Sequence, residues 1–108
     1  MKIINLTPHA INVVVNGQTR TFPSEGVARA TQTSTQVGSL EGIPVFRMEY
    51  GAPVDLPDPE EGVYYVVSAI TATAARESGR ITSDLLLTAN LVRDEASRVV
   101  GCGGFSAL

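Results

Sequence analysis

The sequence predicts an α+β fold, with a mainly antiparallel β-sheet, one short-to-medium helix packed on it, and a C-terminal hairpin. Three observations lead to this prediction. β-Branched runs separated by turn residues recur along the chain, and only one segment, the one after Ser68, carries signals for both ends of a helix. The length of 108 residues, with 44% hydrophobic and 18% charged residues, suits one domain spanning residues 1–108.

Three short strands are expected in the N-terminal part. Lys2–Leu6 and Ile11–Val15 are rich in Ile and Val, which favour extended backbone. Asn16-Gly17 predicts a tight hairpin turn, because both residues tolerate positive φ. Gln18–Phe22 then returns alongside the second strand, and Pro23 ends it because proline lacks the backbone donor of a ladder hydrogen bond.

Two further strands and a long loop follow. Val27–Val37 is rich in Thr and Gln, as in a half-exposed strand, and Ile43–Tyr50 alternates in the manner of a second one. Gly51–Gly62 is rich in proline and acidic residues and exceeds the usual connection length. We expect this loop to contribute nothing to the core.

The only predicted helix follows a buried strand. Val63–Val67 is continuously apolar, which indicates a central strand. Ser68 is a suitable N-cap for a helix that runs through Ser78, and Gly79 suits the position after its end. The helix is rich in Ala and Thr, so it can pack close to a sheet or to a copy of itself.

The C-terminal part predicts a hairpin. Ile81–Thr88 fits either a short helical turn or an extended segment, and its pattern does not decide between them. Leu91–Arg93 and Arg98–Cys102 are expected to pair around a polar four-residue turn that begins at Asp94.

Charge and cysteine content exclude several classes of protein. The net charge of −3 disfavours a nucleic-acid partner. A single cysteine permits no internal disulfide, which fits a reducing compartment. The start lacks the layout of a signal peptide, and no apolar run approaches the roughly 20 residues of a membrane span. We therefore expect a cytoplasmic protein without a membrane partner.

The sequence offers little catalytic chemistry. One His and one Cys cannot build a metal cluster of the usual ligands, so no metal site is expected. The Gly-rich segment at Gly101–Gly104 lies too close to the C terminus to open a dinucleotide-binding helix. His9 suits either a ligand contact or a hydrogen bond to a neighbouring loop. We expect a protein that is not an enzyme and needs no cofactor.

Arginines on the predicted strands remain as candidate ligand contacts. Arg29 lies between apolar neighbours, and Arg93 precedes Asp94 and Glu95. The planar guanidinium suits phosphate and carboxylate oxygens. Each arginine can instead be a solvated surface residue, and Arg93 can form a structural ion pair with Asp94 or Glu95.

Several motifs resemble a signature of small phage and prophage proteins. They are Asn5-Leu-Thr-Pro-His9, Gly42-Ile-Pro-Val45, Tyr65-Val-Val-Ser68, Leu91-Val-Arg-Asp-Glu95 and Val99-Val-Gly-Cys102. The chain is most similar to the phage Thoeris anti-defence sponge family, whose members sequester cyclic ADP-ribose-type immune signals without cleaving them. The resemblance implies an α+β homodimer or higher homo-oligomer in an infected bacterial cell, with ligand pockets at the dimer interface.

The resemblance also implies ligand-binding residues. Arg29 and Arg93 are expected on phosphate or ribose, with the helix around Arg76 lining the pocket. The rest of the predicted ligand-binding set comprises Asn90, Asp94 and His9. A small phage structural or assembly accessory protein is the alternative function, since Thr-rich strands and an acidic loop suit it equally well. An enzyme acting on a nucleotide or glycan and an inhibitor of a host protein are further alternatives.

Overall fold

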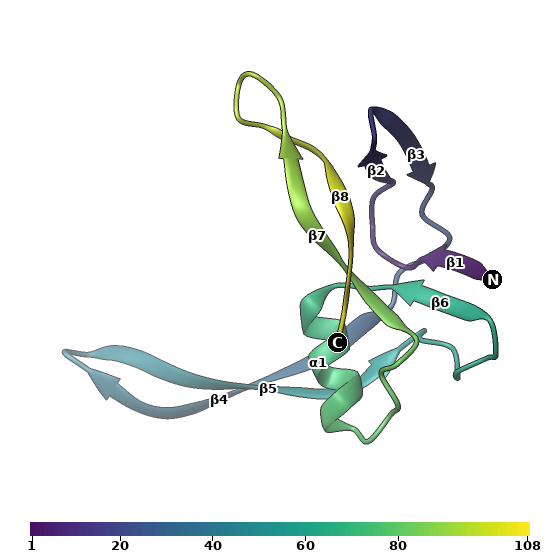
Figure 1. Ribbon diagram of the computed structural model, residues 1–108. Coiled ribbons are helices and arrows are strands. Elements are labelled where there is room, and N and C mark those ends of the chain that lie inside the picture. Colours follow the sequence, from purple (N-terminus) through teal and green to yellow (C-terminus); the bar gives the residue numbers. More distant parts are fainter.

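The body of the protein is a six-stranded sheet, and a separate two-stranded ribbon projects from it (Figure 1). The computed structural model describes all residues, 1–108. The sheet contains β1 (Lys2–Asn5), β2 (Ile11–Val15), β3 (Gln18–Phe22), β6 (Val63–Val66), β7 (Leu85–Arg93) and β8 (Val99–Ala107). The ribbon consists of β4 (Arg29–Leu40) and β5 (Ile43–Val54). With the helix α1 (Ala69–Glu77) and the β7–β8 hairpin, the α+β class is confirmed.

The expectation of a mainly antiparallel sheet is confirmed only in part, because the six-stranded sheet is mixed. Its strand order is β1-β6-β7-β8-β2-β3, and the β1–β6, β6–β7 and β2–β8 pairs are parallel. Within this sheet only β2–β3 and β7–β8 are antiparallel. The position of α1 accounts for the parallel β6–β7 pair, because the helix connects these strands and returns the chain to the end where β6 began.

The sheet curls until its two edge strands approach each other. Asn5, at the end of β1, forms a parallel bridge with Ser24, just after β3. The Glu25 N–H donates to the Asn5 carbonyl at 2.9 Å. The rings of Phe22 on β3 and Phe105 on β8 meet edge to face with centroids 5.7 Å apart, although β2 separates these strands in the sheet. Curling therefore brings together segments that the strand order keeps apart.

Asn5 holds the corner between β1 and β2. Its side chain is fully buried. Its Nδ2 donates to the carbonyls of His9, at 2.8 Å, and Phe22, at 2.9 Å, while its Oδ1 accepts from the Thr7 N–H and hydroxyl. The first motif of the family resemblance is thus a structural corner, in which His9 contributes its backbone carbonyl.

The predicted helix is confirmed in its position and at both ends. The Ser68 hydroxyl accepts from the Thr71 N–H, and Gly79 has the left-handed φ of +88° that favours glycine after a helix. Small side chains on its buried face let α1 approach β4 and β5 at the base of the ribbon closely. Two of them, Ala72 and Ala75, belong to the same core cluster as Tyr65. The close partner of the helix therefore lies within the same chain.

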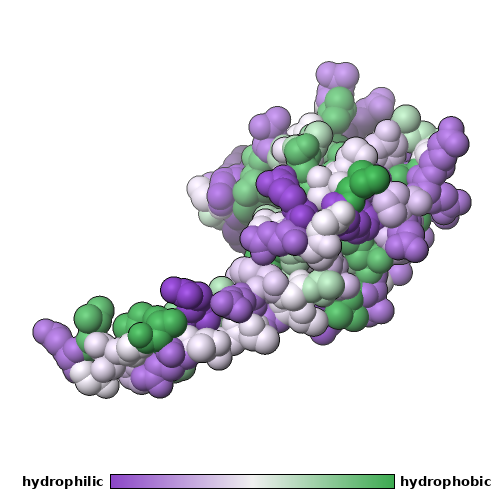
Figure 2. Space-filling view, turned by 90° about the horizontal axis from the view of Figure 1, so that it is seen from below, coloured by the Kyte–Doolittle hydropathy of each residue, from purple (hydrophilic) through white to green (hydrophobic).

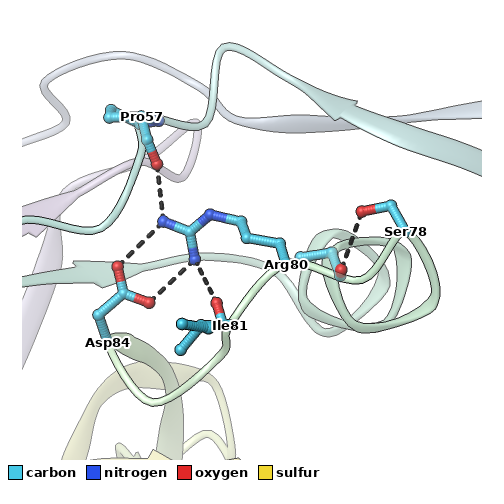
Figure 3. A network of polar contacts seen from close by, with 6 residues as sticks. Pro57, Ser78, Arg80, Ile81 and Asp84 are labelled. Atoms are coloured by element: carbon cyan, nitrogen blue, oxygen red, sulfur yellow. Dashed lines mark hydrogen bonds and ion pairs between the residues drawn. The ribbon is translucent and has the colours of Figure 1, made fainter.

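The acidic loop contributes to the core, contrary to expectation. Leu56 packs against the core cluster that contains Tyr65 and Leu85. Arg80 reaches the loop from the end of α1 and donates from Nη2 to the Pro57 carbonyl at 2.6 Å (Figure 3). Prolines stiffen this loop, and its few apolar and backbone groups are enough to anchor it.

Arg80 also forms a bidentate ion pair with Asp84, the residue that immediately precedes β7. Its Nη1 and Nη2 lie 2.9 and 3.0 Å from the two Asp84 carboxylate oxygens, and Nη1 also donates to the Ile81 carbonyl. The Arg80 side chain is only 13% exposed, and its Nε has no partner. This clamp joins the end of α1, the acidic loop and the start of β7.

Candidate ligand-binding site

A groove at the base of the ribbon is the only one of three surface grooves that any predicted site residue lines. Its volume is about 380 Å³, within the usual range of ligand pockets. Arg29 lines it together with Thr7 and Gln32, while Pro8 and Ile70 supply apolar wall. The groove therefore offers a cation, polar side chains and apolar surface in one place.

The backbone around Arg29 is firmly held. Arg29 begins β4 and pairs with Val54 in β5. The preceding Ala28 donates its N–H to the Leu6 carbonyl at 3.0 Å, and its own carbonyl accepts from the Thr71 hydroxyl at 3.0 Å. The first turn of α1 and the end of β1 thus fix the point where the ribbon leaves the body.

The Arg29 side chain, in contrast, is free. It is exposed and takes part in neither of the two ion pairs of the protein, Arg80–Asp84 and Arg98–Asp94. Ser68 and Thr71 line the same groove, so the N-terminus of α1 borders it. A helix N-terminus adds a favourable field for an anion, although Ser68 already caps one backbone donor. Phosphate is the ligand group that this combination accommodates most readily.

Arg93 and Asp94 lie elsewhere, at the end of β7 and at the start of the turn that leads to β8. Arg93 donates from Nη1 to the Ser97 carbonyl at 2.8 Å. Asp94 pairs with Arg98, with Nε and Oδ2 2.9 Å apart, and also accepts from two backbone N–H groups of the turn. The alternative of an Arg93 ion pair with Asp94 or Glu95 is therefore wrong. These contacts stabilise the turn.

The remaining predicted site residues lie neither in the groove beside Arg29 nor in the β7–β8 turn. Asn90 is exposed on β7 with a φ of +56°, a left-handed conformation that Asn adopts more readily than most residues. Arg76 lies exposed in the last turn of α1, and His9 is exposed at the corner after β1. Within one protomer, the predicted set is not gathered into a single site.

A second groove contains residues that the sequence analysis did not single out. It has a volume of about 480 Å³ and lies inside the curl of the sheet, where Arg20, Phe22 and Phe105 line it. The Arg20 guanidinium carbon lies 4.6 Å from the centre of the Phe22 ring. The alternation of a strand puts Arg20 and Phe22 on one face, so this pairing was accessible from the sequence.

Comparison with protein-family models, curated proteins and solved structures gives no match for this chain. None of its helical structure has the length and apolarity that a membrane crossing requires. No three His, Cys, Asp or Glu side chains are grouped as metal ligands would be.

Proposed function

We propose that this protein is a phage anti-defence protein that binds a cyclic ADP-ribose-type nucleotide signal and sequesters it without cleaving it. In this proposal it acts as a homo-oligomer in the cytoplasm of an infected bacterial cell. The observation that carries the proposal is the unpaired Arg29 in the groove at the base of the ribbon. The resemblance of its motifs to those of small phage proteins, and of the chain to the sponge family, supports the choice of ligand.

The proposed site takes its phosphate contact from Arg29. A pyrophosphate is held best by charge-assisted hydrogen bonds from a guanidinium, and the apolar wall at Pro8 and Ile70 suits the face of a base or ribose. Arg93 lies outside this groove. It reaches the same ligand only if a second protomer presents its β7–β8 turn, so the proposal requires a site shared between two chains.

Isothermal titration calorimetry with cyclic ADP-ribose isomers tests the proposal. We expect wild type to bind one isomer and to release it intact after heat denaturation, as seen by chromatography. Arg29→Ala should weaken binding roughly ten- to a hundredfold, the cost of one lost contact to a charged group. Arg20→Ala, on the other groove, is the matched control and should leave the affinity unchanged.

Three results would contradict parts of this proposal. Consumption of the ligand would make the protein an enzyme. Loss of binding in Arg20→Ala alone would move the site into the curl of the sheet. Absence of binding by wild type would remove the sponge function altogether.

A small phage structural or assembly accessory protein is the second candidate. The observation that favours it is the projecting ribbon, in which every residue from 31 to 49 is exposed (Figure 2). Mass spectrometry of purified virions separates the two functions. An assembly protein is expected in the particle in fixed proportion, whereas a sponge is expected in the lysate only.

A further inference from the structure

The outer part of the ribbon, residues 31–49, is named here the arm. It consists of two strands with no third strand or helix against either face, and all of its residues are exposed. An isolated two-stranded ribbon is only marginally stable in water. The arm therefore lacks, within its own chain, the cover that such a ribbon needs.

The arm is also unusually apolar for exposed structure. Leu40, Ile43 and Phe46 are 70%, 65% and 52% exposed, and Val37, Val45 and Met48 are exposed as well. Figure 2 shows apolar surface gathered toward the tip of the projection. Scattered exposed apolar residues are ordinary, but a concentration of this kind marks an interaction surface.

Both faces of the arm carry apolar side chains. On β5, Ile43 and Val45 point to one face, while Phe46 and Met48 point to the other. The cross-strand partner of Ile43 is Leu40, which extends the first apolar face across the ribbon. An arm of this construction needs cover on two sides.

The body offers a complementary apolar surface on the β7–β8 hairpin. Leu91, Val99 and Val100, named here the strip, are all about half exposed and border a groove of about 310 Å³. The strip lies on the body, whereas the arm extends away from it (Figure 1). One molecule thus carries both a projecting apolar element and an apolar surface able to receive one.

The exposed area of the chain is large enough to form an interface with a second copy. The chain exposes 7248 Å², about 1,500 Å² more than the roughly 5,800 Å² expected of a folded monomer of 11.4 kDa. Its radius of gyration is 16.7 Å, against about 13 Å for a compact chain of this length. The excess of about 1,500 Å² is larger than the roughly 800 Å² that one protomer buries in a typical stable interface.

We infer that the arm docks on a second copy of this chain, in a two-fold dimer. One face of each arm packs on the strip of the partner subunit, and the other face packs on the partner's arm. A two-fold arrangement uses both surfaces on both chains and leaves neither open to further growth. The inference deepens the oligomeric part of the proposed function and is tested without ligand, so failure to bind a nucleotide leaves it standing.

Sedimentation velocity at micromolar concentration is the first test. Wild type should sediment as a dimer, and the arm variant Ile43→Ser/Phe46→Ser, one change per face, should dissociate at least a hundredfold more readily. Thr35→Ser/Gln36→Ser on the same ribbon is the matched control and should remain dimeric. A monomeric wild type, or an arm variant as tightly dimeric as wild type, would overturn the inference.

Mixing two variants tests the pairing of arm with strip. The strip variant Leu91→Ser/Val99→Ser should also dissociate more readily than wild type, because its arms keep only their contact with each other. When it is mixed with the arm variant, one intact arm meets one intact strip, so heterodimers should form more tightly than the arm variant pairs with itself. A strip variant that stays fully dimeric, or a mixture that stays monomeric, would overturn the assignment of the strip. The strip substitutions lie on the body and leave the sequence of the ribbon unchanged. A weaker dimer in the strip variant therefore cannot be attributed to unfolding of the ribbon.

Discussion

Replacement of Asn5 by Leu should destabilise the protein more than any comparable change at the N-terminal corner. Asn5→Leu preserves side-chain volume approximately and removes four hydrogen bonds from a fully buried position. At about 1 kcal/mol per bond, the loss is about 4 kcal/mol. Burial of the leucine side chain returns about 1 kcal/mol, so the free energy of unfolding should fall by about 3 kcal/mol.

This loss converts into a change of melting temperature. For 108 residues the entropy of unfolding is about 0.23 kcal/mol/K, so 3 kcal/mol corresponds to a fall in Tm of about 13 °C. Differential scanning calorimetry measures this at one fixed protein concentration, because the stability of an oligomer depends on concentration. The same energy should appear in urea unfolding as a lower midpoint with an unchanged slope.

Two further variants separate the contributions at this corner. Asn5→Asp retains the acceptor for Thr7 but loses both donors to the carbonyls of His9 and Phe22, so it should also destabilise by several kcal/mol. Thr7→Val removes only partly buried hydroxyl bonds and should cost about 1 kcal/mol or less. A fall in Tm of less than about 4 °C for Asn5→Leu would refute the structural role given to this side chain.

Three further substitutions test other parts of the fold. Arg80→Met leaves Asp84 buried without its partner and should lower the free energy of unfolding by about 3–5 kcal/mol. Urea titration measures this change, and a loss below about 1 kcal/mol would show that the clamp is dispensable. Leu56→Ala should cost about 1–2 kcal/mol by the same measurement, whereas a change near zero would restore the view that the acidic loop is independent of the core. Gly101→Ala places a methyl group 2.7 Å from a carbonyl oxygen of β2 and should cost about 1–3 kcal/mol, while Gly104→Ala, with open space around it, serves as the neutral control in thermal unfolding.

Local signals in the sequence predicted local structure well. The bounds of β2 and β3 agree with the prediction, because an Asn-Gly turn fixes both ends of a short hairpin. The capping role of Ser68 and the position of Gly79 were likewise confirmed. Each of these features depends on neighbours within a few residues.

Features that depend on distant pairing were not predicted. The parallel arrangement of β6 and β7 follows from where α1 packs, and the sequence of α1 does not specify this. The ribbon extends beyond the predicted strands at both ends. β4 continues to Leu40 because Gly38 pairs with Val45, although glycine usually weakens a strand. β5 continues to Val54 because Val54 pairs with Arg29. The ambiguous segment before Thr88 is extended from Leu85 onward, since pairing with both β6 and β8 favours a strand there.

Prediction of the site was limited in the same way, because the contacts of a side chain with distant parts of the chain are not visible in the sequence. Arg29 was singled out in the sequence as an arginine between apolar neighbours, and in the structure it lines a groove. The spacing of Arg80 and Asp84 is visible in the sequence, but their burial is not, so their structural role was missed. The sequence alone does not reveal which arginines form ion pairs and hydrogen bonds within the fold and which have no partner.

The arm and the groove share one structural element, since Arg29 begins the strand whose far end carries the arm. If a partner immobilises the arm, the same contact restrains the base of β4, and a more rigid Arg29 loses less freedom when a ligand binds. Dimerisation and ligand affinity are then linked, and by reciprocity a bound ligand strengthens the dimer. An assembly protein requires the arm but has no need of a free guanidinium in a groove at its base. A sequestering protein uses both, which is why Arg29, and not the arm, discriminates between the two proposed functions.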